Sequence, residues 1–304
     1  MGHVPVLVEQ IVEALLPAAR VIDGTVGAGG HARALLEAGA GAVLGLDLDA
    51  DALALAQTAL APFGSRAQLA RASYASMAAE AARLGWDRVD AVLLDLGLSS
   101  MQLDTPARGF AFSADGPLDM RFDPQGDRPT AAELVNHLDE SELAALFRDY
   151  GEEPHSRKLA RAVVQSRPFE TTGQLAEAIM RAVPRRPGDH LHPATLVFQA
   201  LRIAVNDELE TVRRALPAAV DLLRPGGRLA VISFHSLEDR IVKQFFRQAS
   251  TDCICPPQVP VCVCGHRASV RLVTRKPATA GADEVARNPR SRSAKLRVVE
   301  RLAP

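Results

Sequence analysis

Strand-like and helical segments alternate over the first third of this 304-residue chain. Four apolar stretches with the composition of buried strands lie at 19–23, 41–49, 67–73 and 89–96. Segments with helical spacing separate them at 29–37, 51–60 and 75–84. Such alternation is typical of a parallel sheet whose strands are joined by right-handed helical crossovers. We therefore expect an α/β fold.

The alternation stops in the middle of the chain. Proline, glycine and aspartate are frequent in the irregular stretch 103–129, and the pattern over 130–183 is helical throughout. Capping boxes, in which Ser or Thr is followed three residues later by Glu or Gln, are predicted to open helices at Thr130 and Thr171. A further long helix is predicted from His192.

Strand-like segments return near the C-terminus, at 222–234, 269–274 and 294–301. The sheet domain is therefore expected to be discontinuous, formed by 1–103 and 191–304. An all-helical insert at 104–190 interrupts it and is expected to recognise the substrate. Ser236 and Asp239 are predicted to cap the helix that follows them, and 278–293 is expected to be a mobile loop.

A glycine-rich loop follows the first strand, in the stretch VIDGTVGAGGH at 21–31. Its spacing differs from the G-x-G-x-x-G pattern of dinucleotide-binding folds, and it lacks the Lys-Ser/Thr pair of a P-loop. Asp23 precedes the loop, and a carboxylate there favours a cationic ligand or hydroxyl groups over a phosphate. S-adenosylmethionine (AdoMet) fits, because it carries an ammonium, a sulfonium and a carboxylate that backbone N–H groups can bind.

Acidic residues end three of the predicted strands: Asp23, Asp47 and Asp95. In open α/β sheets ligands bind at the carboxyl ends of the strands, so these three side chains are expected to border one crevice. Asp47 is placed to accept the ribose hydroxyls, and Tyr74, after the third strand, to flank the adenine. Taken singly, each feature also has a structural explanation, such as a tight turn or a helix-start acid.

The overall charge gives no indication of a nucleic-acid partner, because the formal net charge is -1. Local basic clusters do occur, one in RNPRSRSAKLR at 287–297 and one in the insert at Arg181, Arg185 and Arg186. The sequence shows neither a signal-peptide pattern nor an apolar run long enough for a membrane helix, so we expect a soluble cytoplasmic protein.

All four cysteines lie in one short segment, as the pairs Cys253-x-Cys255 and Cys262-x-Cys264. Structural zinc sites more often use C-x-x-C spacing. The thiols can hold a metal or form disulfides on oxidation, and the predicted site residues include no metal ligand.

Seven motifs resemble the ribosomal RNA small-subunit methyltransferase H family, also called MraW. They occur in order between residues 3 and 297, and they are HVPVLVEQ, DGTVGAGGH, DLGLSSMQLD, FSADGPLDMR, LRIAVNDEL, LRPGGRLAVISFHSLEDRIVK and NPRSRSAKLR. The resemblance implies a Rossmann-like class I methyltransferase sheet with a helical insert. It also implies an enzyme that uses AdoMet to methylate N4 of a cytidine in the decoding region of bacterial small-subunit ribosomal RNA, expected within an assembled or nearly assembled subunit.

The resemblance carries over seven AdoMet contacts: Gly29, Gly30, His31, Asp47, Tyr74, Asp95 and Gln102. Family members often have Phe at the position of Tyr74, so an aromatic ring is kept. The stretch Asp95-Leu-Gly-Leu-Ser99-Ser100 lacks the Pro-Pro-aromatic motif with which many amino-methyltransferases hold the target amine.

Catalytic residues are predicted from the chemistry of the target amine and from the segments expected to line the crevice, and RNA-binding residues from the basic side chains. Asp95, Ser99 or nearby carbonyls are expected to accept its N–H, while in-line placement supplies most of the rate. His235 is a further catalytic candidate, in SFHSLEDRIVK. Three arginines are predicted to bind the RNA substrate: Arg240, Arg290 and Arg292.

Two other functions remain open at the level of sequence. A nicotinamide oxidoreductase would use a similar sheet, but the glycine spacing argues against it. A non-catalytic ribosome-assembly factor would bind RNA without needing a cofactor. The acids at three strand ends favour a cofactor and therefore argue against this function.

Overall fold

The computed structural model describes residues 5–184, 192–256, 258 and 261–303. The chain divides into two compact units, and we call them the sheet unit (Met1–Gly97 with Leu209–Pro304) and the helical unit (Leu98–Glu208). The sequence predicted an insert over 104–190, so the observed helical unit extends farther at both ends.

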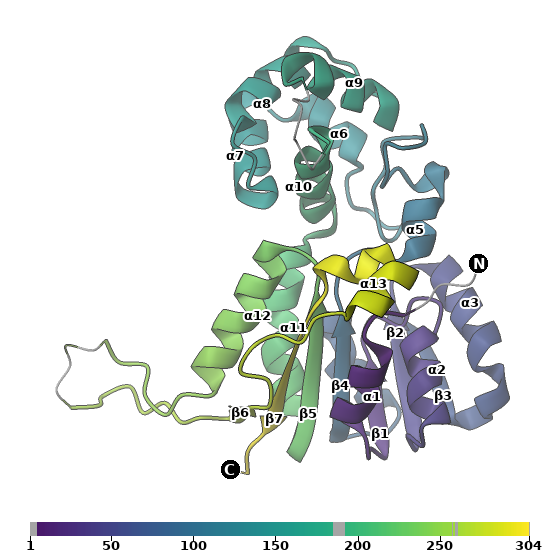
Figure 1. Ribbon diagram of the computed structural model, residues 1–304, viewed down its shortest axis with the longest axis vertical. Coiled ribbons are helices and arrows are strands. Elements are labelled where there is room, and N and C mark those ends of the chain that lie inside the picture. Colours follow the sequence, from purple (N-terminus) through teal and green to yellow (C-terminus); the bar gives the residue numbers. More distant parts are fainter. Residues whose placement is uncertain (1–4, 185–191, 257, 259–260, 304) are drawn as a thin grey trace. The chain divides into compact units, whose positions relative to one another are not determined.

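The sheet unit contains a seven-stranded mixed sheet (Figure 1). Its strands are β1 (Arg20–Asp23), β2 (Ala42–Asp47), β3 (Ala67–Arg71), β4 (Val89–Asp95), β5 (Leu223–Ser233), β6 (Val270–Leu272) and β7 (Lys295–Arg301). They lie in the order β3-β2-β1-β4-β5-β7-β6. β1 to β5 are parallel to one another, whereas β7 pairs antiparallel with both β5 and β6. The chain order reverses direction between β1 and β4, the position at which open α/β sheets bind ligands.

Helices cover both faces of this sheet, as expected for parallel strands that are apolar on both sides. They are α1 (Val8–Leu15), α2 (Gly30–Glu37), α3 (Ala50–Leu60), α4 (Met77–Arg83), α11 (Glu208–Leu222), α12 (Ser236–Ala249) and α13 (Ala282–Arg287), with 3-10 turns η1 (Ala61–Arg66), η2 (Tyr74–Ser76) and η4 (Pro289–Ser293). Leu93 packs in the core that includes α1 to α3, and its neighbour Leu94 in the core that includes α4, α11 and α12. This alternation along β4 confirms the Rossmann-like α/β fold.

The helical unit is a cluster of helices around its own apolar core. Its elements are α5 (Ser100–Asp104), η3 (Pro106–Arg108), α6 (Ala131–His137), α7 (Glu140–Gly151), α8 (Ser156–Gln165), α9 (Thr172–Ala182) and α10 (Ala194–Asn206). Both predicted capping boxes are confirmed, because the Thr130 and Thr171 hydroxyls each accept the backbone N–H three residues on. A capping box contributes on the order of 1 kcal/mol to each helix.

The helix α10 explains why the helical unit ends later than predicted. Val197 and Leu201 are fully buried in the core of the helical unit, not against the sheet. Asp207 then adopts a left-handed conformation with φ 52°, which ends α10 before α11 begins. The predicted long helix from His192 is therefore two helices, α10 and α11.

The segment 278–293 was wrongly expected to be a mobile loop. It forms α13 and η4, and Glu284 Oε1 accepts the Leu7 backbone N–H at 2.8 Å. Ala278 pairs with Leu296 of β7. These contacts fasten the segment to Leu7 and to β7 within the sheet unit. Within the part of the chain that the structure describes, no helix is long and apolar enough to cross a membrane.

Candidate active site

Three carboxylates lie at the carboxyl edge of the parallel strands, as predicted. Asp23, Asp47 and Asp95 are the last residues of β1, β2 and β4. The strands are neighbours, since Asp23 is in register with Gly45 of β2 and Leu93 of β4. The three carboxylates therefore border one end of the sheet, where the chain reverses its winding.

The glycine loop connects Asp23 to α2 through two turns in the left-handed region. Gly27 has φ 51° and donates its N–H to Asp47 Oδ2 at 2.9 Å. Gly29 has φ 87°, and a Cβ there would also lie 3.3 Å from Ala56 Cα, so both positions favour glycine. Gly29 is the N-cap of α2, and no described side chain caps that helix. The first N–H groups of α2 are thus available to an anionic group such as a carboxylate.

Asp47 holds the loop in place with both of its oxygens. Oδ2 accepts from Gly27, and Oδ1 accepts the Asp49 N–H at 2.9 Å. Burial raises the pKa of Asp47 despite these hydrogen bonds. Each carboxylate oxygen still has a second lone pair, so Asp47 can accept ribose hydroxyls while it fixes the loop.

Asp23 is fully buried and only partly hydrogen-bonded. Its Oδ1 accepts the Thr25 N–H at 3.2 Å, whereas Oδ2 has no hydrogen-bond partner among the described residues. Burial raises the pKa of Asp23 to about 6, against the opposing charge of the His31 ring. A buried carboxylate oxygen without a donor is costly, so Oδ2 is an acceptor suited to a cationic or hydroxyl-bearing ligand.

Asp95 is the second carboxylate with a buried oxygen that lacks a partner. Its Oδ1 has no hydrogen-bond partner in the described part of the chain, and its Oδ2 lies 3.7 Å from His31 Nδ1. Burial, and secondarily the charge of Glu238, raise the pKa of Asp95 to about 7. The Thr25 hydroxyl accepts the Asp95 N–H at 2.7 Å and fixes the end of β4.

His31 was predicted to contact AdoMet, but its side chain is engaged inside the protein. Nε2 lies 2.8 Å from the Val6 carbonyl oxygen, which can only accept, so Nε2 carries a proton. The ring is buried and presents Nδ1 to Asp95. His31 can therefore offer a ligand its backbone N–H at the start of α2, while its ring orients Asp95.

These features fit a ligand with AdoMet's charges. An uncapped helix N-terminus suits its carboxylate, and the carboxylates with raised pKa values favour its positive groups. Sequence reasoning missed three contributors to this site: Thr25, the Val6 carbonyl and Glu238. The hydroxyl in the DGT stretch of the loop was a signal for Thr25, whereas the other two depend on tertiary packing.

Tyr74 and the pair Ser99 and Gln102 have different surroundings. Tyr74 begins the turn η2 after β3 and is half-buried against the core of the sheet unit. Ser99 and Gln102 belong to the helical unit, where they form the capping box of α5. The Ser99 hydroxyl accepts the Gln102 N–H at 3.2 Å, and Gln102 Oε1 accepts the Ser99 N–H at 3.1 Å. This cap accounts for both residues without a ligand.

The start of α12 differs from the prediction. His235, not Ser236, is the N-cap, and its partner in the capping box is Glu238. His235 Nε2 lies 3.2 Å from Glu238 Oε1 but is not aligned for a hydrogen bond, so it can still donate to a ligand. Asp239 caps nothing, because its carboxylate pairs with Arg297 at 2.7 Å and with Lys295 at 3.3 Å.

The basic segment at 287–297 is therefore only partly available to RNA. Arg297 is buried in its ion pair with Asp239, and Lys295 shares that carboxylate. Arg290 and Arg292 are exposed on η4. Arg240 is exposed on α12.

The cluster predicted in the insert is only partly described. Arg181 pairs with Glu177 at 3.8 Å, while Arg185 and Arg186 lie outside the described residues.

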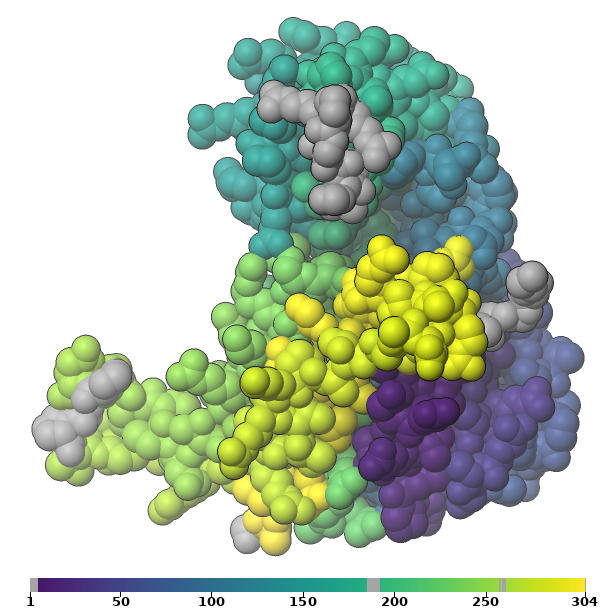
Figure 2. Space-filling view, in the orientation of Figure 1, coloured from purple at the N-terminus to yellow at the C-terminus, as the bar shows by residue number. Residues whose placement is uncertain are grey.

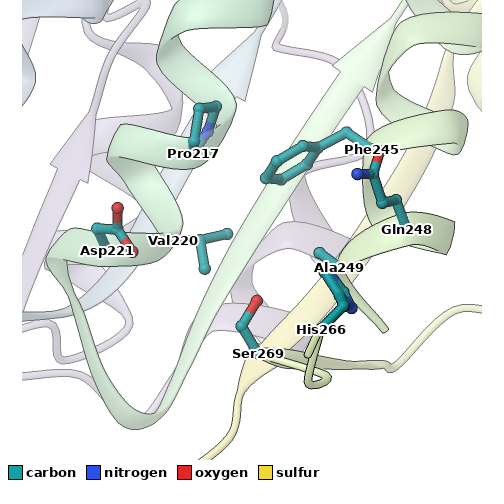
Figure 3. A pocket seen from close by; sticks show the side chains of 8 residues that line it. All are labelled: Pro217, Val220, Asp221, Phe245, Gln248, Ala249, His266 and Ser269. Atoms are coloured by element: carbon teal, nitrogen blue, oxygen red, sulfur yellow. The ribbon is translucent and has the colours of Figure 1, made fainter. Parts of the chain in front are cut away.

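The sheet unit also contains a cavity between α11 and α12 (Figure 3). It is lined by Pro217, Val220, Asp221, Phe245, Gln248, Ala249, His266 and Ser269. The C-terminal halves of α11 and α12 contribute most of the lining, and α11 leads into the first residue of β5. The cavity thus lies at the opposite edge of the sheet. Its volume of about 200 Å³ is below the roughly 300 Å³ typical of ligand pockets.

Comparison with known proteins identifies the family of this chain. The sequence pattern of the MraW methylase family matches residues 1–302. The chain belongs to the MraW methylase family. Proteins named ribosomal RNA small subunit methyltransferase H are about half identical to it. That of Solidesulfovibrio magneticus is 52% identical over 309 residues, covering 99% of this chain and 95% of that protein.

Two further relatives carry the same name. The protein of Nitratidesulfovibrio vulgaris is 51% identical, covering 99% of this chain and 86% of its own length. The protein of Thermomicrobium roseum is 51% identical, covering 99% and 94%. Membership of the family makes the chain a methyltransferase, with AdoMet as the methyl donor.

Proposed function

We propose that this methyltransferase transfers a methyl group from AdoMet to N4 of a cytidine in the decoding region of bacterial small-subunit ribosomal RNA. One observation supports the chemistry most directly: Asp23 and Asp95 each have a buried carboxylate oxygen without a partner among the described residues, near an uncapped helix N-terminus. The names of the relatives support small-subunit ribosomal RNA as the substrate. An RNA substrate of this kind, in an assembled or nearly assembled subunit, places the reaction in the cytoplasm.

In this proposal, different residues of the sheet unit bind different groups of AdoMet. When bound, AdoMet supplies an electrophilic methyl group on its sulfonium. The N–H groups of Gly30 and His31 bind its carboxylate, and Asp47 accepts its ribose hydroxyls. Asp23 Oδ2 accepts a hydrogen bond from its ammonium group, and the ring of Tyr74 packs against its adenine. In the helical unit, Gln102 is the remaining proposed contact.

Asp95 is the proposed catalytic residue. The exocyclic amine of cytosine is a weak nucleophile, because its lone pair is delocalised into the ring. Asp95 Oδ1 accepts one N–H of this amine, which orients the lone pair toward the methyl group. Ser99 and His235 are proposed to assist, Ser99 by accepting the other N–H and His235 by donating from Nε2 to the base. Methylation gives an ammonium that loses its proton readily, and Asp95, with its raised pKa, can take that proton.

RNA binding is proposed to involve three exposed arginines. Arg290 and Arg292 bind phosphates beside the target, and Arg240 contacts the flipped nucleotide. The helical unit is proposed to recognise the surrounding RNA. Replacing Arg290 and Arg292 with alanine should weaken binding and reduce the slope of log affinity against log salt by roughly 2. An unchanged slope would remove these arginines from the interface.

The function is tested with small subunits from cells that lack this enzyme. The chain is incubated with tritium-labelled AdoMet and either subunits or naked ribosomal RNA, and the labelled nucleosides are identified. We expect N4-methylcytidine from subunits with the native chain and with Asp87→Asn, a substitution at an exposed turn, and none with Asp95→Asn. Label on another base would refute the cytosine assignment. RNA and AdoMet binding without transfer to either substrate would favour the binding-factor alternative.

A further inference from the structure

The segment between α12 and β6 extends away from the sheet (Figure 1). Its base is held by hydrogen bonds from Ser269 N to Ala249 O at 2.8 Å and from Ala268 N to Asp252 Oδ1 at 3.1 Å. Beyond this base its apolar side chains face solvent, with Val261 71% and Val263 79% exposed. Hydrophobic burial therefore does not explain how this part of the segment keeps its conformation.

Four cysteine side chains converge in this exposed segment. They come from its two arms: Cys253 and Cys255 on the outgoing arm, Cys262 and Cys264 on the returning arm. All four Sγ atoms lie within 4.8 Å of one another. Cys262 Sγ and Cys264 Sγ are 3.6 Å apart, and Cys264 Sγ and Cys253 Sγ are 3.9 Å apart.

These sulfur–sulfur distances match one tetrahedral metal ion. With a Zn–S bond of about 2.3 Å, tetrahedral geometry places neighbouring sulfurs about 3.8 Å apart. The two distances across this cluster lie on either side of that value. A disulfide requires about 2.05 Å, and all four thiols are free. An iron–sulfur cluster would hold its cysteine sulfurs farther apart than a single ion does.

The local backbone also supports a metal-binding role. Val263 directs its N–H at Cys255 Sγ at 3.5 Å, a contact that stabilises a thiolate. Val263 lies between the two cysteines of the returning arm, and the sulfurs of these two cysteines lie on one side of the chain, 3.6 Å apart. The sequence alone left metal binding open, because C-x-C spacing is less usual than C-x-x-C. The convergence of the two arms is the new observation.

We propose that Cys253, Cys255, Cys262 and Cys264 bind one zinc ion in a structural site. Four thiolates complete the tetrahedral shell, so no position stays open for a water or a substrate, and the ion takes no part in methyl transfer. Its role is to join the two arms of a segment that lacks a core. The site is independent of the proposed RNA substrate and of the three carboxylates at the strand ends.

Metal analysis of the full-length chain tests the proposal. The chain is purified under reducing conditions with zinc in the growth medium, desalted, and assayed by mass spectrometry for metals. We expect one zinc per chain, and less than a tenth of that after Cys255→Ser combined with Cys262→Ser. Fluorescence of Trp86, the single tryptophan, which lies in the core of the sheet unit, verifies that each variant is folded.

A matched control and a spectroscopic probe make the test specific. His266 lies in the same segment, where its Nδ1 contacts the Thr251 carbonyl at 2.7 Å, so His266→Ala should retain the zinc. Cobalt(II) in place of zinc should give the intense visible bands of tetrahedral thiolate coordination. The proposal is overturned by zinc-free protein that shows only octahedral cobalt, by loss of zinc in His266→Ala alone, or by a mass showing the four thiols paired as disulfides.

Discussion

Replacing Asp95 with asparagine should stabilise the ligand-free sheet unit while abolishing methyl transfer. Asparagine has nearly the same shape but carries no charge, so it avoids the cost of burying the carboxylate at the end of β4. Burial together with Glu238 raises the pKa of Asp95 from its ordinary value of 3.8 to about 7. The folded state therefore holds this proton more tightly than the unfolded state does.

The sign and magnitude of the change in the free energy of unfolding follow from this difference in pKa between the folded and unfolded states. Above pH 7 the full cost of the buried charge applies, about 4 kcal/mol at 1.36 kcal/mol per pKa unit. As pH falls from 7 toward 3.8, Asp95 is protonated in the folded state first, and the cost decreases. We expect Asp95→Asn to raise the free energy of unfolding by about 4 kcal/mol at pH 8 and by about 2 kcal/mol at pH 5.

Urea unfolding followed by Trp86 fluorescence measures this change in stability in the sheet unit. Trp86 lies in the core of the sheet unit, so its signal reports the unfolding of that unit alone. Asp87→Asn, at an exposed turn, should change stability by less than about 0.5 kcal/mol at either pH. A gain from Asp95→Asn that is the same at pH 5 and pH 8, or a loss at both, would refute the argument.

Three further predictions follow from the same contacts. AdoMet affinity, measured by calorimetry, should rise roughly tenfold from pH 6 to pH 7.5. The carboxyl groups of Asp23, with a pKa of about 6, and Asp95, with a pKa of about 7, must ionise to bind a cation. The affinity for S-adenosylhomocysteine, which lacks the sulfonium charge, should depend less on pH. Gly24→Ala should cost about 1–3 kcal/mol in urea unfolding, because its Cβ would lie 2.6 Å from a leucine methyl group, whereas Gly281→Ala, which meets nothing within 4 Å, should cost less than about 1 kcal/mol. Asp239→Asn should lower the free energy of unfolding by about 3 kcal/mol at both pH 5 and pH 8. Arg297 lowers the pKa of Asp239, so the stabilisation from this ion pair is lost only below pH 3.8.

The carboxylates at the strand ends could be predicted because strand periodicity and topology decide where strand ends lie. Once β1, β2 and β4 are identified as parallel neighbours, their last residues must share an edge. Asp23, Asp47 and Asp95 therefore required no knowledge of tertiary contacts. The capping boxes at Thr130 and Thr171 were equally local, because each depends on residues three positions apart.

Features that depend on choosing between distant partners could not be predicted. The apolar stripe of α10 shows that the helix is buried but not against which core, so the insert was predicted too short. Histidine is not among the usual N-cap residues, so pattern reasoning assigned the cap of α12 to Ser236 instead of His235. Arg297 looked like part of an RNA-binding run, because its partner Asp239 is distant in sequence.

The raised pKa values at the strand ends link the stability of this fold to its function. A chain selected for stability alone would have neutral residues at Asp23 and Asp95, since each has a buried carboxylate oxygen without a partner among the described residues. The charges persist at a cost of several kcal/mol. A cation bound beside these carboxylates would offset that cost by supplying the missing partner. Under the proposed function, binding of AdoMet relieves this unfavourable charge burial, and this is why Asp95→Asn is expected both to stabilise the protein and to inactivate it.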